Sequence, residues 1–346
     1  MEPKAPHGLR YANLASPGLS RAREADGFRY LTSRGKDLHD PRALKRIRQL
    51  AIPPAWEDVW ISADPDGHIQ AVGRDAKGRK QYRYHARWRQ ARDEAKYERL
   101  PEFASKLPAL RARTARDLNR PDLDQTKVVA AVIRLLEGTL IRVGNEEYAR
   151  RNRSYGLTTL RDRHVTVKGP IIEFRFRGKS GKDHVVTLKD ARLAGIVKAC
   201  QDLPGRTLFQ CIGVDGNRRS LTSADVNAYI RDAMSADFSA KDFRTWSASV
   251  LAAALLRKEE AAASHRDGAR RITRAVSEVA SRLGNTPAIC RKSYIHPAVF
   301  EAYLDGSLAA APEAAPGVRH RLRASERMFV AFLRSHSHPP DIKMAA

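Results

Sequence analysis

Cysteine is scarce in this chain of 346 residues, which contains three: Cys200, Cys211 and Cys290. The three thiols form no CxxC pair and show no spacing typical of a disulfide framework or a zinc site. We therefore expect no structural disulfides and no metal site. The three side chains are interpreted as reduced core residues of a cytoplasmic protein.

Long apolar segments are also missing. The richest run, residues 248–256, is followed at once by Arg257 and Lys258, and it is far shorter than the roughly 20 residues of a membrane helix. The chain begins with residues 1–4, Met-Glu-Pro-Lys, and no apolar stretch of a secretory signal follows. The sequence therefore predicts no membrane partner and a cytoplasmic, nucleoid-associated protein.

The motifs that usually carry phosphoryl chemistry are absent as well. The chain has no GxxxxGK[ST] loop, no HExxH motif and no carboxylates at the spacing of a two-metal site. These absences weigh against an ATPase, a polymerase and a metal-dependent nuclease. If such a chain cuts DNA, side-chain cations must stabilise the transition state, so we expect no cofactor and no metal.

Acidic residues are outnumbered by basic ones. The chain has 39 Asp+Glu against 63 Lys+Arg, a net charge of +24 and a pI near 10.4. A surplus of this size attracts polyanions, which makes nucleic acid the expected partner and predicts strongly salt-dependent binding. A merely basic protein remains an alternative on charge alone.

Turn residues and apolar periodicity divide the chain into three parts. Residues 1–22 mix Pro, Gly, Ser and Arg without periodicity, and they are predicted to be a mobile basic arm. A strand meander over residues 58–85, with turns at Pro-Asp-Gly and Lys-Gly, predicts a β-rich domain over 23–92. Residues 93–346 are expected to form one larger, mainly helical catalytic domain.

Within that larger domain the periodicity changes several times. Residues 127–140 carry the apolar stripe of an amphipathic helix, and residues 164–188 predict three antiparallel strands. Everything after Lys189 is interpreted as helical. A long helix from Asp267 should stop at Gly284, and Thr286-Pro287 should open a short one. A linker over residues 309–316 should precede a last helix that ends near Arg334.

Several cations and one tyrosine stand at positions suited to an anion. Arg142 lies between an apolar helix and Gly144, Lys179 lies in a hairpin turn, and Arg244 lies in the first turns of a helix. A helix N-terminus offers free N–H groups and a favourable dipole. Tyr294 follows the short helix. Taken singly, each side chain has an ordinary interpretation as a solvated, ion-paired or core residue.

The order and the flanks of these residues distinguish them. The matching blocks are residues 72–84, 141–148 with 154–160, 176–179, 241–246 and 284–294. In this order they resemble the type IB DNA topoisomerases of the short, poxvirus-like branch, from about Gly27 to beyond Tyr294. The resemblance implies an α+β fold: a two-lobed, C-shaped clamp with a small β-rich N-terminal domain. The larger, mainly helical catalytic domain would carry a three-stranded antiparallel sheet, as in the tyrosine recombinases.

The resemblance also implies a reaction, the relaxation of supercoiled duplex DNA through a transient single-strand break. Tyr294 would attack a phosphodiester and leave a 3′-phosphotyrosine and a 5′-hydroxyl. Arg142 and Arg244 would hold the non-bridging oxygens, and Lys179 would protonate the departing 5′-oxygen. A covalent intermediate stores the bond energy, so no ATP would be needed. A monomer would suffice, because one cut strand swivels around the intact one.

The sequence departs from the family pattern at Asn285, where a histidine is common. An amide can donate a hydrogen bond to a phosphate oxygen but carries no charge and transfers no proton. We therefore expect Asn285 to act as a neutral donor in the catalytic set. The positions implied to contact DNA, where an ordinary exposed strand is the alternative for the first three, are Gln81, Tyr82, Tyr84, Lys241 and Tyr148.

Two other classes of protein stay open. A tyrosine recombinase shares the Arg, Lys, Arg and Tyr chemistry, but it would assemble through a synapse, and its nucleophile block usually has a second histidine. The N-terminal strand meander favours the topoisomerase. A catalytically silent DNA-binding protein would be equally compatible with the charge.

Overall fold

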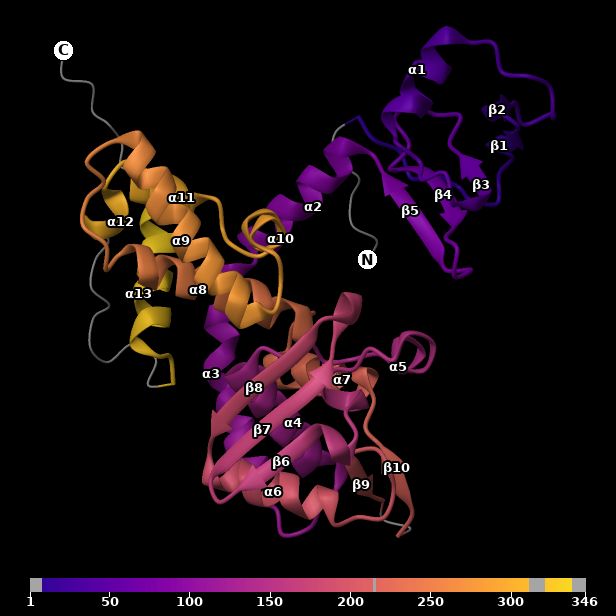
Figure 1. Ribbon diagram of the computed structural model, residues 1–346. Helices are drawn as coiled ribbons and strands as arrows, with labels where there is room; N and C mark the ends of the chain where they lie inside the picture. Colours follow the sequence, from indigo (N-terminus) through magenta and orange to yellow (C-terminus); the bar gives the residue numbers. More distant parts are fainter. Residues whose placement is uncertain (1–7, 214–215, 311–320, 338–346) are drawn as a thin grey trace, which may run out of the picture. The chain divides into compact units, whose positions relative to one another are not determined.

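The computed structural model describes residues 8–213, 216–310 and 321–337, apart from the side chain of Ser180. The chain divides into two compact units, Met1–Lys96 and Tyr97–Ala346. Figure 1 shows the helices and strands of each unit. Among the described residues, no helix combines the length and the apolar content needed to cross a membrane.

The first unit is built on a five-stranded antiparallel sheet in the order β2-β1-β3-β4-β5. Its strands are β1 (Leu19–Glu24), β2 (Gly27–Leu31), β3 (Glu57–Ile61), β4 (Ile69–Arg74) and β5 (Lys80–Tyr84). Helix α1 (Pro41–Gln49) adds Ile47 to a small core with Leu19, Val59 and Ile61. Helix α2 (Ala86–Glu98) follows β5 and contains the boundary between the units.

The predicted meander over residues 58–85 is confirmed as β3, β4 and β5. The predicted mobile arm is wrong for residues 19–22, which belong to β1, while residues 1–7 lie outside the described part of the chain. Apart from buried Leu19 and the small Ala22, β1 is polar, and it pairs with β2 on one side and β3 on the other. Backbone pairing of this kind leaves no apolar alternation in the sequence.

The second unit is mainly helical around one hydrophobic core. Its helices are α3 (Leu100–Asp117), α4 (Gln125–Thr139), α5 (Glu146–Asn152), α6 (Ala191–Gln201), α7 (Ser223–Met234), α8 (Ala240–Leu256), α9 (His265–Leu283), α10 (Pro287–Ser293), α11 (Ala298–Leu304), α12 (Ser307–Ala310) and α13 (Ala324–Ser337). α4 packs against α3, α6, α7 and α8 and is capped by Asp124, which accepts from the Lys127 N–H at 2.8 Å. A helix surrounded in this way is apolar on most of its faces.

A three-stranded antiparallel sheet covers part of α4 and α6, as predicted. Its strands are β6 (Val165–Lys168), β7 (Ile171–Arg177) and β8 (Asp183–Lys189), in that order. Ile172, Phe174 and Phe176 of β7 alternate into the core. The turn between β7 and β8 contains a short 3₁₀ segment, Lys179–Gly181.

The prediction that only helices follow Lys189 is wrong at one place. β9 (Gln210–Ile212) and β10 (Arg218–Ser220) pair as a small antiparallel sheet. Strands of three residues are too short to display a period of two, so the sequence pattern could not reveal them. The helices expected from Asp267 and after Thr286 are confirmed as α9 and α10.

The end of the chain agrees in part with the expected linker and last helix. Ala309 and Ala310 of that linker close α12, and residues 311–316 lie outside the described part of the chain. The last helix is α13, which runs a few residues past Arg334.

Candidate active site

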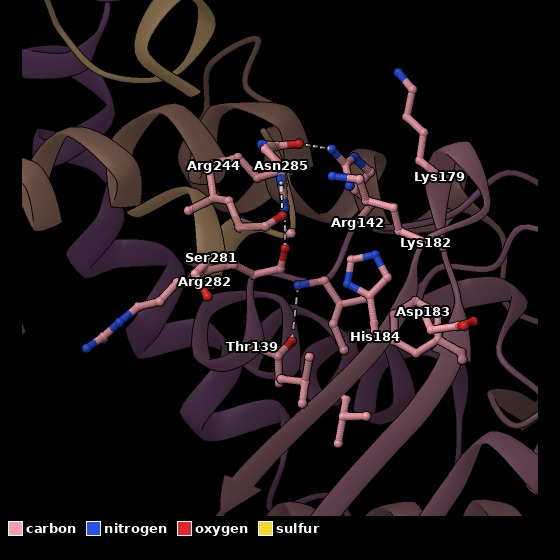
Figure 2. Close-up of a pocket in the computed structure, with 18 of the residues that line it drawn as sticks. Thr139, Arg142, Lys179, Lys182, Asp183, His184, Arg244, Ser281, Arg282 and Asn285 are labelled. Atoms are coloured by element: carbon pink, nitrogen blue, oxygen red, sulfur yellow. Dashed lines mark hydrogen bonds between the residues drawn. The ribbon is translucent and has the colours of Figure 1, made fainter. Parts of the chain in front are cut away.

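Segments far apart in the sequence of the second unit converge on one pocket of about 210 Å³. They are the loop after α4, the β7–β8 turn, the first turns of α8 and the loop after α9. Figure 2 shows Arg142, Lys179, Arg244 and Asn285 among the residues that line it. Three of these four residues are cations, so the pocket is suited to an anion.

Backbone hydrogen bonds and two closely packed glycines fix the loop that carries Arg142. The Leu157 N–H donates to the Arg142 carbonyl at 2.9 Å, and the Thr158 N–H donates to the Val143 carbonyl at 2.7 Å. A Cβ at Gly156 would collide with the Arg142 carbonyl oxygen, and Gly144 has a φ of 100°. Only glycine adopts that φ without strain and allows so close an approach. The loop that carries Arg142 is therefore pinned before any ligand arrives.

Arg244 is the most deeply buried of these cations, at 4% exposure. Its Nη1 donates to the Leu140 carbonyl, and its Nη2 donates to the Leu283 carbonyl at 2.7 Å. These acceptors end α4 and α9, where the helix dipole favours a cation. Burial, followed by the charge of Arg142, lowers the pKa of Arg244 to about 10, so it remains charged at neutral pH.

Tyr294 lies beside Arg244 at the end of α10. The Cζ of Arg244 is 5.2 Å from the centre of the Tyr294 ring. Burial raises the pKa of Tyr294. The charge and hydrogen bond of Arg244, followed by those of Arg142, lower the pKa by more than burial raises it, so the pKa lies below its ordinary value. A lowered pKa increases the fraction of phenolate, which is the nucleophilic form.

Asn285 is bonded to the second arginine of the site. Its Oδ1 accepts from Arg142 Nη2 at 2.5 Å, as the dashed line in Figure 2 shows. Because a guanidinium only donates, the amide atom that faces Arg142 must be the oxygen, Oδ1, and the other must be the nitrogen, Nδ2. The Asn285 Nδ2 is buried and has no partner among the described residues. The donor end of this amide is therefore oriented and has no acceptor among the described residues.

Lys179 lies at the rim, in the turn between β7 and β8, and its side chain is exposed. In Figure 2 it extends away from Arg142 and Asn285. Its ammonium makes no ion pair within the described part of the chain. The structure thus brings Arg142, Arg244, Asn285 and Lys179 to one pocket. Tyr294 is not among the residues that line this pocket, but it lies against Arg244.

The residues expected to contact DNA lie in both units. Tyr82 and Tyr84 of β5 are exposed and stacked, with ring centres 5.9 Å apart. Gln81 is on the opposite face of that strand, where its Nε2 donates to Asp75 Oδ2 at 3.0 Å. In the second unit, Tyr148 of α5 is 50% exposed and Lys241 of α8 is exposed.

Sequence reasoning missed three residues near the site. Lys182 and His184 line the pocket, and Ser249 of α8 contacts the backbone of the Tyr294 segment. His184 had a signal, because it falls on the same face of β8 as Val186 and Leu188, where an apolar side chain is expected. Ser249 had none, since a serine within a helix has many ordinary interpretations.

The arrangement defines a class of site: a tyrosine whose pKa is lowered by arginines, beside a cation-lined pocket. Within the described part of the chain, no three His, Cys, Asp or Glu side chains gather in a way that could hold a metal ion. A phosphodiester fits such a pocket, because arginine donates in a planar fork to its non-bridging oxygens.

Comparisons with known proteins agree with this class. Residues 85–314 match the family described as eukaryotic DNA topoisomerase I, catalytic core. Residues 27–75 match bacterial DNA topoisomerase IB, N-terminal domain. The DNA topoisomerase 1B of Acanthamoeba polyphaga mimivirus is 34% identical over 293 residues, 83% of this chain and 87% of that protein.

More distant relatives share a shorter region. The DNA topoisomerase 1B of vaccinia virus (strain Copenhagen) is 26% identical over 50% of this chain and 58% of its own length. DNA topoisomerase 1 beta of Arabidopsis thaliana is 27% identical over 48% of this chain and 17% of its own length. The chain belongs to the type IB DNA topoisomerase family. It is thus a DNA topoisomerase, and these matches do not support the recombinase or the silent DNA-binding protein.

Proposed function

We propose that the chain relaxes supercoiled DNA by a reversible single-strand break in which Tyr294 is the nucleophile. The observation that carries this proposal is the contact between Arg244 and the Tyr294 ring, with the lowered pKa of the phenol. The Tyr294 Oη–P bond forms while the P–O5′ bond breaks, and the phenol proton passes to solvent. The free 5′-hydroxyl later reverses the exchange and rejoins the strand.

Arg142 and Arg244 hold the two non-bridging oxygens of the phosphate. Both guanidinium groups are bonded to neutral acceptors, Asn285 Oδ1 for the first and two carbonyls for the second. Neutral acceptors orient an arginine without cancelling its charge, so the charge stays available for the transition state. Asn285 Nδ2 adds a further neutral hydrogen bond to the same oxygens.

Lys179 delivers the proton that the departing 5′-oxygen needs. Its position on a hairpin turn at the edge of the pocket, with an exposed side chain, allows it to reach over a bound phosphate. An alkoxide is a poor leaving group, and a positioned acid accelerates its departure by about 10²- to 10⁴-fold.

Contacts to duplex DNA are proposed on both units. The stacked pair Tyr82 and Tyr84 offers an exposed aromatic surface, while Tyr148 and Lys241 are exposed near the site-bearing loops of the second unit. Gln81 would have to exchange its bond with Asp75 for one to a base. The reaction needs neither ATP nor metal, and the chain works as a monomer in the cytoplasm, associated with the nucleoid.

Plasmid relaxation tests the proposal. Supercoiled plasmid is incubated with the protein in EDTA without ATP, and topoisomers are resolved on a gel. We expect stepwise relaxation that is lost in Tyr294→Phe and retained in Tyr303→Phe, a matched change elsewhere in the second unit. Denaturing the reaction should leave protein attached to the 3′ end of the nick. Relaxation by Tyr294→Phe, or attachment at the 5′ end, would refute the mechanism.

A further inference from the structure

His184 occupies a central place in the pocket that the proposed mechanism leaves without a role. It lies in β8, directly opposite Phe176 of β7, and the two rings stack with centres 5.1 Å apart and planes 8° apart. Val186 and Leu188 follow on the same inward face of the strand. The imidazole is therefore held rigidly by the sheet.

The ring fills the space left by two glycines of the catalytic blocks. A Cβ at Gly178, the residue before Lys179, would lie 2.5 Å from His184 Nε2. A Cβ at Gly284, the residue before Asn285, would lie closer still to His184 Cε1. The imidazole thus separates the backbone that carries Lys179 from the backbone that carries Asn285.

The backbone at Gly178 shows that this space is reserved for the ring. Gly178 has φ −98° and ψ −162°, an extended conformation open to any residue. Backbone strain therefore does not require glycine there, and the close approach of His184 does. Gly284 differs, because its φ of 61° favours glycine in any case.

The contact is one of packing between neutral groups. Burial, followed by the charges of Arg142, Arg244 and Lys182, lowers the pKa of His184, so the ring is neutral at neutral pH. Its Nε2 is buried and has no hydrogen-bond partner among the described residues. A phenyl ring has a similar shape and would fill the same space.

We propose that His184 is a positioning residue whose ring sets the distance between the Lys179 turn and the Asn285 loop, and so aims Lys179 at the departing oxygen. The inference rests on the proposed role of Lys179 as the acid. Its consequence is specific: loss of the ring should harm proton delivery rather than DNA binding or nucleophilic attack.

A change of leaving group tests this consequence. A thiolate leaves without a proton, because thiols are far more acidic than alcohols, so a DNA duplex with sulfur in place of the scissile 5′-oxygen bypasses the acid. Single-turnover cleavage of the normal duplex should fall about 10- to 100-fold in His184→Ala, the scale of a misplaced catalytic group. Cleavage of the sulfur-containing duplex by the same variant should return to near the wild-type rate.

The conservative variant and the opposing glycine provide controls. His184→Phe should cleave both duplexes at nearly the wild-type rate. Gly178→Ala should reproduce the defect, because its Cβ meets the ring, and adding it to His184→Ala should cost much less than it does alone. Equal loss on both duplexes in His184→Ala, normal cleavage by His184→Ala, or strict additivity with Gly178→Ala would each overturn the proposal.

Lys179→Ala separates this inference from the mechanism beneath it. If the sulfur-containing duplex restores cleavage by Lys179→Ala but not by His184→Ala, the positioning role alone is wrong. If it fails to restore Lys179→Ala, the proposed acid is wrong and the inference falls with it. Binding of uncleaved duplex and thermal unfolding of each variant show that the proteins compared are folded.

Discussion

At the scale of single residues, the two arginines of the site are bonded to neutral acceptors. Arg142 bonds to an amide oxygen, and Arg244 bonds to two backbone carbonyls. Within the described part of the chain, neither forms an ion pair, although ion pairs involving other arginines are common. A carboxylate partner would neutralise the charge that a phosphate needs. Neutral partners therefore preserve the electrostatic function of the site.

The amide of Asn285 has separable acceptor and donor functions, and substitutions can distinguish them. Asn285→Ala should slow cleavage by about 10²- to 10³-fold, the usual effect of losing an oxyanion donor. Asn285→His should be nearly normal, because imidazole can also donate. Asn285→Asp keeps the acceptor for Arg142 but loses the Nδ2 donor, so it should be slow. Single-turnover cleavage measures all three, and an inactive Asn285→His would contradict the neutral-donor role.

The lowered pKa of Tyr294 predicts the pH dependence of cleavage. The phenolate attacks, so the rate should rise with pH and level off below the ordinary tyrosine pKa of about 10. Burial opposes ionisation, and Arg244 and then Arg142 favour it. Arg142→Ala removes one cation, so the midpoint of its profile should move to higher pH, whatever its maximal rate. A midpoint that stays in place would show that the charge of Arg142 does not act on the phenol.

At the scale of elements, the site is assembled from helix ends. Arg244 bonds to the carbonyls that close α4 and α9, and the loops that follow these helices carry Arg142 and Asn285. Helix α8, which carries Arg244, also contacts the backbone at Tyr294 and His296. Ser249 Oγ donates to the Tyr294 carbonyl at 3.1 Å and accepts from the His296 N–H at 2.9 Å. One helix therefore positions both a phosphate clamp and the nucleophile.

These two hydrogen bonds predict a role for Ser249 in positioning Tyr294. Ser249→Ala leaves the partly buried His296 N–H and Tyr294 carbonyl without this partner, so the end of α10 should shift. We expect cleavage to fall about tenfold or more while the affinity for uncleaved duplex is unchanged. Ser247→Ala on the same helix is the control and should behave as wild type. Weaker duplex binding by Ser249→Ala would point instead to a general loss of structure.

At the scale of the whole molecule, a buried ion network joins distant parts of the second unit. Arg111 of α3 bonds Glu137 of α4 at 2.9 Å and both carboxylate oxygens of Glu326 of α13 at 2.7 Å. Glu326 also accepts from Trp246 Nε1 of α8 at 3.3 Å. Helix α13 is thus bonded to α8, the helix that carries Arg244, and we infer that α13 stabilises the position of α8.

Removal of Glu326 should therefore destabilise the protein strongly. Glu326→Ala removes one of the two carboxylates paired with the buried Arg111, a change that costs about 3–5 kcal/mol. Urea unfolding followed by tryptophan fluorescence measures the loss. Glu278→Ala, which breaks the exposed pair with Arg282 at 3.2 Å, should cost less than about 1 kcal/mol. A Glu326→Ala variant as stable as Glu278→Ala would show that the network contributes nothing.

Much of this protein was determined locally and could be predicted from the sequence. Apolar periodicity and capping residues predicted α4, α9 and α10, and alternation predicted the β6-β7-β8 sheet, because these signals lie within each element. The order of the motif blocks indicated the family and the candidates Tyr294, Arg142, Lys179 and Arg244. β1 and the β9–β10 pair escaped prediction because long-range backbone pairing, rather than side-chain pattern, creates them.

The sequence by itself determined which residues could carry the chemistry, and only the tertiary structure decided how they are held. No local pattern reveals that the two carbonyls holding Arg244 close other helices, or that Asn285 turns its oxygen to Arg142. The fit of His184 between Gly178 and Gly284 is equally hidden. These contacts join backbone atoms and side chains far apart in the chain, and a carbonyl or an absent Cβ has the same form wherever it occurs. Folding brings them together, and it thereby makes a site from residues that are individually ordinary.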